Sequence, residues 1–286
     1  MILVVGATGL LGSTIVHRLL ADGHNVRVLV RPQSNFQPLV DAGATTVFAD
    51  LKAPETLSPA CQGVDTVITT ANSAARGGDD TVESVDLQGN RALIEAAEQA
   101  GVRHFIFVSA LGADPDSPVP FLSAKGAAES QLRASGMDHT ILEPNVYLDI
   151  WFPMIVAMRL QQQQPVLLIG EGQRKHSFIA MNDVARYAVA AVSNPAARNQ
   201  TLVLGGPEAV SWRDIIATTE RMSNDSIPVE NIPVGQTLPD LPDVVSGLMT
   251  SFEMFDSPID MHDTARTFDV PPTSHEQWIQ EFFGRA

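Results

Sequence analysis

Hydrophobic residues in the first half of the chain gather in short runs that alternate with amphipathic stretches. The first run, residues 2–5, ends at a glycine, and residues 11–21 then carry apolar side chains at helical spacing. Strands that alternate with helices in this way are typical of right-handed βαβ units, which build a parallel sheet covered on both faces. The pattern predicts strands over residues 2–5, 26–30, 46–48, 66–69, 104–108 and 139–142, and helices over residues 11–21, 82–99 and 121–135.

The alternation becomes less regular after residue 144. Ser211 and Asp214 resemble a capping box at the start of one helix, and Asn182 is placed to cap another. We therefore expect an α/β fold with a doubly wound parallel sheet in residues 1–150, to which later segments return, and a smaller C-terminal α+β cap in residues 151–286. In the cap, helices are expected over residues 150–160, 183–192, 212–222, 244–255 and 274–283, and short strands over residues 166–169, 178–179 and 202–204.

The chain is acidic. Its 286 residues include 18 Lys and Arg against 33 Asp and Glu, a formal net charge of −15. This charge argues against binding to nucleic acid or to anionic membranes, both of which need a basic surface, although one local basic group could still bind a small anion. Residues 1–5 are too short for the apolar region of a signal peptide, and no run approaches the roughly 18 apolar residues of a membrane span. Cys61 is the only cysteine, so no disulfide can form within the chain, and we expect a cytoplasmic protein.

Three glycines stand at three-residue spacing immediately after the first predicted strand. A dinucleotide needs this arrangement, because Gly6 permits a tight turn, Gly9 lets the backbone approach the pyrophosphate, and Gly12 lets the helix pack closely on the sheet. The free N–H groups at the start of the helix then bind the phosphates. We therefore predict a Rossmann-type sheet whose loop binds NAD(P)(H) through Gly6, Thr8, Gly9, Leu10, Leu11 and Gly12.

The residue after the second strand bears on which cofactor is bound. A site for NAD usually carries Asp or Glu there, which binds the ribose hydroxyls, whereas this chain has Arg31, followed by Ser34. A cation suits the 2′-phosphate of NADP, so NADP(H) is the preferred cofactor; the alternative is that Arg31 is a surface residue and that NAD(H) also binds. Ligands of open α/β sheets bind at the carboxyl ends of the strands. On that ground we place Asp50 and Leu51 at the adenine, and Thr70, Ala71 and Asn72 beneath the ribose and the nicotinamide.

Several segments of the chain resemble the short-chain dehydrogenase/reductase superfamily and, within it, the atypical NmrA-like branch. That branch includes NAD(P)H-dependent quinone reductases, triphenylmethane-dye reductases, isoflavone-reductase-like enzymes and non-enzymatic redox sensors. The resemblance covers most of the chain. It is carried by the glycine motif at residues 6–12, by Asp50 and Leu51, and by residues 96–101, 105–109 (FIFVS), 124–129, 140–144, 178–188 (FIAMNDVARYA) and 205–207.

The resemblance implies a catalytic set of Ser, Tyr and Lys. Ser109 occupies the serine position and Lys125 the lysine position, but the tyrosine position holds Phe121. A phenyl ring cannot exchange a proton, so neither the usual carbonyl/alcohol reaction nor sugar epimerisation is expected. Lys125 could contact the nicotinamide ribose, could in addition donate a proton, or could simply face solvent. The expected activity is hydride transfer to a quinone, a dye cation or an activated enone, whose developing charge water or Lys125 can neutralise.

The loop after the sixth strand is the last candidate region. Pro144 and Asn145 are expected near the cofactor, and Tyr147 is a candidate pocket residue and a candidate substitute proton donor. An apolar cluster follows this loop. It represents either helix packing or one wall of a flat pocket for an aromatic substrate. The cluster consists of Trp151, Phe152, Met154 and Met158.

These residues together predict an NAD(P)H-dependent oxidoreductase that acts on an aromatic or quinoid small molecule without the usual tyrosine. The alternatives are a non-enzymatic sensor of the NADP(H) redox state and a polyketide-type tailoring oxygenase on the same fold. No metal site is expected, because the histidines show no metal-ligand spacing. A homodimer could form through the long helices at residues 82–99 and 121–135, although nothing in the sequence requires it.

Overall fold

The computed structural model describes residues 1–74, 77–239, 241 and 243–284. It forms two compact units, each assembled from separate segments of the chain. Unit 1 comprises Met1–Pro144, Val184–Val203 and Thr267–Val270, and unit 2 comprises Asn145–Asp183, Leu204–Arg266 and Pro271–Ala286. The division into domains at residue 150 stays a prediction. All the cofactor and catalytic residues predicted from the sequence belong to unit 1, except Asn145 and Tyr147.

Unit 1 is built on a seven-stranded sheet with the order β3-β2-β1-β4-β5-β6-β8. The first six strands in this order pair in parallel, and β1 lies between β2 and β4. The chain first runs from β1 toward one edge and later returns to β4 on the other side of β1, and such a reversal creates a crevice at the carboxyl ends of these two strands. The Rossmann-type doubly wound sheet is therefore confirmed. Its strands are β1 (Ile2–Val5), β2 (Val26–Val30), β3 (Thr45–Phe48), β4 (Thr66–Thr69), β5 (His104–Val108), β6 (Asp138–Pro144) and β8 (Gln200–Leu204).

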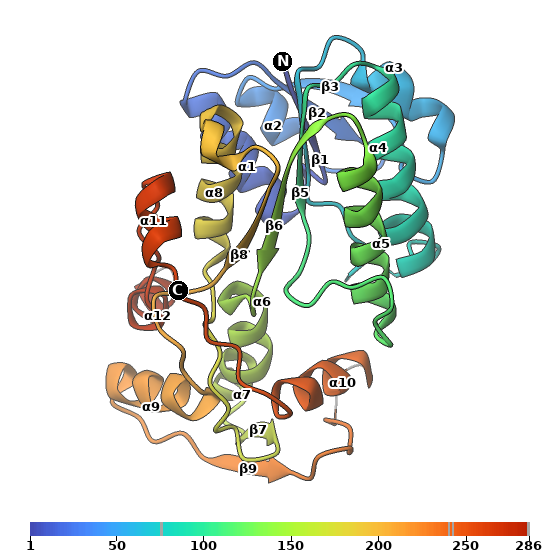
Figure 1. Ribbon diagram of the computed structural model, residues 1–286. Helices are drawn as coiled ribbons and strands as arrows, with labels where there is room; N and C mark the ends of the chain where they lie inside the picture. The colour runs from blue at the N-terminus through green and yellow to red at the C-terminus, as the bar shows by residue number, and fades with distance from the viewer. Residues whose placement is uncertain (75–76, 240, 242, 285–286) are drawn as a thin grey trace. The chain divides into compact units, whose positions relative to one another are not determined.

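Helices cover both faces of this sheet. In Figure 1, α4 (Asn90–Gln99) and α5 (Pro120–Ala134) lie side by side on one face, and α1 (Leu10–Ala21) and α8 (Met181–Ser193) lie on the other. The core on the α4 and α5 side includes Leu93, Phe105 and Phe107, all fully buried. Each such side chain contributes roughly 1.5–3 kcal/mol through its burial, so the sheet is a rigid support for the loops at its carboxyl edge. No helix among the described residues combines the length and the apolar character needed to cross a membrane.

The single helix predicted over residues 82–99 has two parts. Residues Val82–Gly89 form a π-helix, η2, and α4 follows it. Gly89 allows η2 to approach the loop after β3, since a Cβ at this position would lie 2.8 Å from the Leu51 Cβ. The apolar spacing fitted an α-helix and could not reveal the wider π turns, which are frequent at functional sites. These turns carry Asp86, a residue of the site described below.

Unit 2 contains a two-stranded parallel sheet and several helices. β7 (Val166–Ile169) pairs with β9 (Val229–Ile232). The fully buried Phe152 packs edge-to-face against Trp278 and Phe282, with ring centroids 5.3 and 5.1 Å away. Within the predicted apolar cluster, Phe152 is therefore a core residue and not a pocket wall. The helices of unit 2 include α6 (Leu148–Phe152), η3 (Pro153–Ala157), α7 (Met158–Gln161), α9 (Trp212–Ser223), α10 (Asp243–Phe252) and α12 (His275–Gly284).

Some local predictions are confirmed and others are wrong. Ser211 and Asp214 form the predicted capping box of α9. Residues 178–179 belong to no named strand, and Ile179 makes only an isolated bridge. Helix α8 begins at Met181, so Asn182 lies inside its first turn and is not its cap. Besides β9, short elements that carry too few residues to show a period were not predicted: α2 (Gln37–Asp41), η1 (Pro54–Thr56), α3 (Leu57–Cys61), η4 (Pro195–Ala197) and α11 (His262–Phe268).

Candidate functional site

Two glycines make the shape of the turn after β1 possible. Gly6 has a φ of +80°, and a Cβ at this position would lie 2.6 Å from Thr70 Oγ1. A Cβ at Gly12 would lie 2.2 Å from the carbonyl oxygen of Gly6. Both distances are far below a van der Waals contact, so any larger residue would push the turn, the helix or the neighbouring strand apart. The fold itself therefore requires glycine at these two positions.

Gly9 differs from its two neighbours in the motif. Among the described residues, the atom nearest to a Cβ at Gly9 would be the Gly6 carbonyl oxygen at 3.4 Å, an ordinary contact, and its φ of −80° suits any residue. Gly9 is exposed, and the adjacent Leu10 leaves 71% of its surface open. A bare backbone at the start of α1 fits a phosphate that approaches more closely than a side chain would allow. This turn therefore fits a bound dinucleotide.

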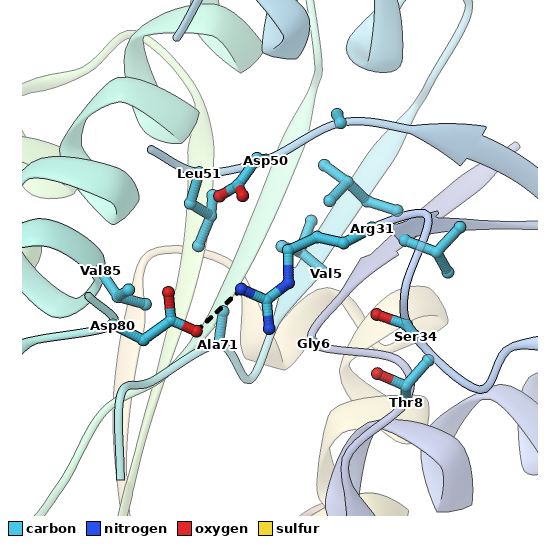
Figure 2. A pocket seen from close by; sticks show the side chains of 13 residues that line it. Val5, Gly6, Thr8, Arg31, Ser34, Asp50, Leu51, Ala71, Asp80 and Val85 are labelled. Atoms are coloured by element: carbon cyan, nitrogen blue, oxygen red, sulfur yellow. Dashed lines mark hydrogen bonds and ion pairs between the residues drawn. The ribbon is translucent and has the colours of Figure 1, made fainter. Parts of the chain in front are cut away.

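A pocket opens at the carboxyl ends of β1 to β4, next to this turn (Figure 2). Ser34 lines this pocket. Asp80 and Val85, from the segment after β4, line it as well, and neither was predicted from the sequence. Asp80 follows a glycine-rich stretch that has no periodicity, so only its charge could have drawn attention to it. Six of the predicted cofactor residues line the pocket: Gly6, Thr8, Arg31, Asp50, Leu51 and Ala71.

Other predicted cofactor residues support the turn and do not line the pocket. The Thr70 hydroxyl donates to the carbonyl oxygens of Val5 and Gly6, each at 3.4 Å. The Asn72 side-chain amide donates to the Thr70 carbonyl at 3.2 Å, and Leu11 lies half-buried in α1. Any direct contact of Thr70, Asn72, Leu11 or Leu10 with a cofactor stays a prediction.

Two cations and one carboxylate meet at the side of the pocket. Arg31 Nη1 lies 2.8 Å from Asp80 Oδ2, and Lys52 Nζ lies 2.7 Å from Asp80 Oδ1. Figure 2 shows the Arg31 side chain pointing across the pocket toward Asp80. The hydrogen bond from Lys52, together with Arg31, lowers the pKa of Asp80, and Asp80 raises the pKa of Lys52. Both shifts favour the charged forms of Asp80 and Lys52. Lys52 was not predicted.

Lys125 is buried beside two aromatic rings. Only 2% of it is exposed, and Nζ lies 4.9 Å from the centre of the Phe107 ring and 5.5 Å from that of Phe121. Its ammonium donates to the Val108 carbonyl at 3.2 Å and lies 3.8 Å from Asp86 Oδ1, a carboxylate with no exposed surface. The interpretation of Lys125 as a solvent-facing lysine is therefore wrong.

The surroundings of Lys125 also change its acidity. Burial lowers its pKa, and the nearby carboxylates of Asp86 and Glu129 oppose this effect without cancelling it. Asp86 is held in place by Ser73, whose backbone N–H and hydroxyl both donate to Asp86 Oδ2, at 2.9 and 2.6 Å. Oδ1 of Asp86 accepts no hydrogen bond from the described residues, so Lys125 is the charge that balances it.

Ser109, a predicted catalytic residue that directly follows β5, donates a hydrogen bond to a carboxylate. Its acceptor is Oε1 of Glu129, a buried residue of α5 whose Oε2 accepts from Arg133 at 2.9 Å. Near this carboxylate, burial and the charge of Glu129 raise the pKa of Glu143 to about 7. The hydroxyl of Ser109 is thus engaged within the protein, and its role in orienting a substrate stays a prediction.

The loop after β6 leads from unit 1 into unit 2. The Pro144 carbonyl accepts from the Leu111 backbone N–H at 3.1 Å. Asn145 donates its side-chain amide to the Ser257 carbonyl and hydroxyl oxygens, both at 3.0 Å. Burial and the charge of Asp149 raise the pKa of Tyr147, which makes its phenol a weaker acid than an ordinary tyrosine. Roles of Pro144 and Asn145 in cofactor binding, and of Tyr147 in catalysis, stay predictions.

The fold and this pocket define a class of protein. The sequence pattern of the NAD(P)H-binding family matches residues 6–195, so the chain belongs to that family. Among its relatives, the photosystem II assembly factor Ycf39 from Synechocystis sp. is 31% identical over 309 residues, which cover 99% of this chain and 91% of that protein. The NAD(P)H azoreductase from Xenophilus azovorans is 34% identical over 217 residues, which cover 76% of this chain and 72% of that protein.

A solved structure supports the same fold. The NADPH-dependent quinone oxidoreductase QOR2 from Escherichia coli, in its complex with NADPH, matches with a TM-score of 0.81, and the match covers 99% of this chain and 100% of that one. The two sequences are 23% identical, so the likeness concerns the fold. The relatives thus include both reductases and an assembly factor, and the family alone does not decide between these activities.

Proposed function

We propose that the protein is a reductase that uses NADP(H) to reduce a small aromatic or quinoid molecule. One observation carries this proposal: the dinucleotide pocket keeps its binding groups, while Phe121, 5.5 Å from the Lys125 ammonium, stands where a proton-donating tyrosine would be expected. A quinone, an azo dye or a dye cation spreads the charge that a hydride brings over a delocalised system. Such a substrate needs no strong acid beside the atom that is attacked.

The residues near Lys125 suit this chemistry. Bound NADPH supplies the hydride. Phe121 offers an apolar face to a flat ring and neither takes nor gives a proton. Lys125, with its lowered pKa, is a better proton donor than an ordinary lysine, and its ammonium can neutralise the charge that develops on the substrate. That an azoreductase is among the relatives supports a substrate of this class.

The preference for NADP(H) rests on the two cations of the pocket. Arg31 and Lys52 stand after β2 and β3, where the adenosine ribose of a dinucleotide is expected, and a 2′-phosphate would be attracted to both. Arg31→Asp should therefore weaken the binding of NADPH far more than that of NADH. Equal losses for the two cofactors would contradict the preference.

The experiment that tests the activity follows the absorbance of the reduced nicotinamide with purified protein. NADPH and NADH are supplied in parallel, with a panel of quinones, azo dyes, triphenylmethane dyes and enones. We expect consumption above the protein-free blank, faster with NADPH, and its loss in Lys125→Met. If no acceptor is reduced although NADPH binds to the same sample, the protein is not a reductase of this class.

The phenylalanine at position 121 also favours a second function. Phe121 removes the proton donor that most members of the superfamily use, and a relative that covers nearly the full chain is a photosystem II assembly factor. Such a protein would bind NADP(H) and change its affinity for a protein partner without turnover. Binding of NADPH without consumption for any acceptor is the result expected in that case. A cytoplasmic location and a homodimer stay predictions.

A further inference from the structure

Asp80 occupies the place in the pocket where a phosphate would be attracted. Its side chain is only 8% exposed, although it lines an open pocket, and each of its carboxylate oxygens carries one cation. Arg31 lies at 2.8 Å from one oxygen and Lys52 at 2.7 Å from the other. These are the distances of charge-assisted hydrogen bonds, so Asp80 already holds both cations in the way that a bound phosphate would hold them.

We propose that Asp80 is a specificity-determining residue of this site, an internal anion that competes with the 2′-phosphate of NADP(H) for Arg31 and Lys52 and so limits the preference for NADP(H) over NAD(H). This inference rests on the proposed function only in that the pocket takes a nicotinamide dinucleotide.

The competition follows from the number of charges. Among the described residues, Arg31 and Lys52 form ion pairs with the Asp80 carboxylate, and a 2′-phosphate would bring a charge of roughly −1.5 to −2 to these two cations. The Asp80 carboxylate must then move away or stay beside a like charge in a partly enclosed site, and both cost free energy. Asp50 and Asp79 add further negative charge around Lys52.

NAD(H) meets a different situation. Its adenosine ribose carries a hydroxyl at the 2′ position, which can donate to a carboxylate and brings no charge. Asp80 can therefore keep both of its cations when NAD(H) binds. The same residue that opposes a phosphate thus tolerates a hydroxyl, and this difference is the origin of the selectivity.

The test measures binding by isothermal titration calorimetry, with 2′,5′-ADP as the probe that carries the 2′-phosphate and 5′-AMP as the probe that lacks it. Asp80→Asn removes the charge and nearly keeps the shape. The matched control is Asp79→Asn, which removes the same formal charge from the neighbouring exposed residue, for which no ion pair to Arg31 or Lys52 is found among the described residues. NADPH and NADH are titrated into the same samples.

We expect Asp80→Asn to bind 2′,5′-ADP about tenfold more tightly than the unmodified protein and to bind 5′-AMP within about twofold of it. Asp79→Asn should change the ratio of the two affinities by less than about threefold, because an exposed charge is screened. Asp80→Ala, which removes the carboxylate by truncation, should shift the ratio in the same direction as Asp80→Asn.

A further variant tests whether Asp80 acts through the two cations. In the background of Arg31→Ala and Lys52→Ala, the substitution Asp80→Asn should leave the ratio of the two affinities unchanged. If the ratio still rises there by as much as in the unmodified background, Asp80 acts by some other route and the proposal is overturned.

Two results would overturn the proposal directly. Weaker binding of 2′,5′-ADP to both Asp80 variants would show that Asp80 organises the cations for the phosphate instead of competing with it. Equal tightening for 2′,5′-ADP and 5′-AMP would show that it has no part in selectivity. Failure of the unmodified protein to bind any of the four compounds would overturn the proposed function and this inference together, whereas NADPH binding with an unchanged ratio would overturn the inference alone.

Discussion

The two halves of the sheet in unit 1 differ in whether the polar residues near them are exposed or buried. At the carboxyl ends of β1 to β4, backbone groups and charged side chains line an open pocket, and Gly9 and Leu10 are exposed beside it. Around β5 and α5, polar and charged side chains are buried and contact one another: Lys125 forms an ion pair with Asp86 of η2, and the Ser109 hydroxyl donates a hydrogen bond to Glu129. The first half is arranged to receive a ligand, and the second half is arranged around internal pairs.

This difference separates two properties that a dehydrogenase needs. We predict that binding of a dinucleotide depends on the glycine turn and on the pocket beside it, both of which are formed in the structure. The tyrosine that the family resemblance predicts as proton donor would stand at position 121, where this chain has a phenylalanine, which carries no acidic group. A member of this family can therefore keep the cofactor site and change or lose its chemistry, and relatives that include an azoreductase and an assembly factor are consistent with such a separation.

The largest effect is expected in the buried half, at the pair formed by Lys125 and Asp86. Lys125→Met leaves a fully buried carboxylate without its cation, which should lower the free energy of unfolding by about 3–5 kcal/mol. Urea unfolding monitored by circular dichroism measures this loss. The double variant with Asp86→Asn should regain most of it, because no unpaired charge remains. A loss below about 1 kcal/mol in the single variant would mean that the pair is not needed to balance Asp86.

The next largest effect is expected at the glycine turn, where Gly12 and Gly9 should differ in whether an added methyl group lowers stability or weakens NADPH binding. Gly12→Ala places a Cβ 2.2 Å from a backbone oxygen and should cost about 3 kcal/mol or more in stability. Gly9→Ala meets no such contact and should cost no more than about 1 kcal/mol, but it should weaken NADPH binding about tenfold, since the added methyl group faces the phosphates. Urea unfolding and calorimetric titration of both variants check this pair. A large stability loss in Gly9→Ala would contradict the distinction.

A smaller effect is expected from restoring the missing phenol. Phe121→Tyr adds a hydroxyl near the Lys125 ammonium, so reduction of a simple ketone or aldehyde should rise about tenfold above its background. Quinone reduction should change by less than about threefold, because it does not depend on this acid. Rates of NADPH oxidation with both kinds of acceptor provide the comparison. No gain for the carbonyl, with quinone reduction intact, would indicate that substrates do not approach Phe121.

The smallest effect concerns pH. The pKa of Glu143 is raised to about 7 in the folded protein, above its ordinary value of 4.5. Between these values the folded state holds a proton that the unfolded state has released, so the contribution of Glu143 to stability is full below about pH 4.5 and is lost as the pH rises to about 7. Because the group is partly exposed, we expect this contribution to be about 1 kcal/mol.

Glu143→Gln tests this expectation. The variant should lose less stability than the unmodified protein between about pH 5 and pH 7.5, a window that covers most of the range between the two pKa values. Glu55→Gln, which replaces an exposed carboxylate of unit 1, is the control and should follow the unmodified protein. Chemical unfolding at a series of pH values gives the profiles. Identical slopes for all three proteins would contradict the assigned pKa.

Much of the fold was predictable because its signals are local. A buried strand that ends at Gly6 and a helix with apolar residues at a period of 3.6 are visible in a few consecutive residues, and the strands of the sheet were placed to within a few residues. Elements of only three to seven residues, such as α2 and α3, carry too few positions to show a period. The π-helix η2 was mistaken for an α-helix because its apolar residues fit both spacings.

The sequence by itself determined the Rossmann-type sheet, the glycine turn and the absence of tyrosine at position 121, since each depends on the identity of neighbouring residues. Only the tertiary structure decided which charges meet. Asp80 and Arg31 are 49 positions apart in the sequence, and Lys125 and Asp86 are 39 positions apart. No local sequence pattern relates residues at such separations. The tertiary structure also set the pKa values of Lys125 and Glu143, because these depend on how far folding removes each side chain from water.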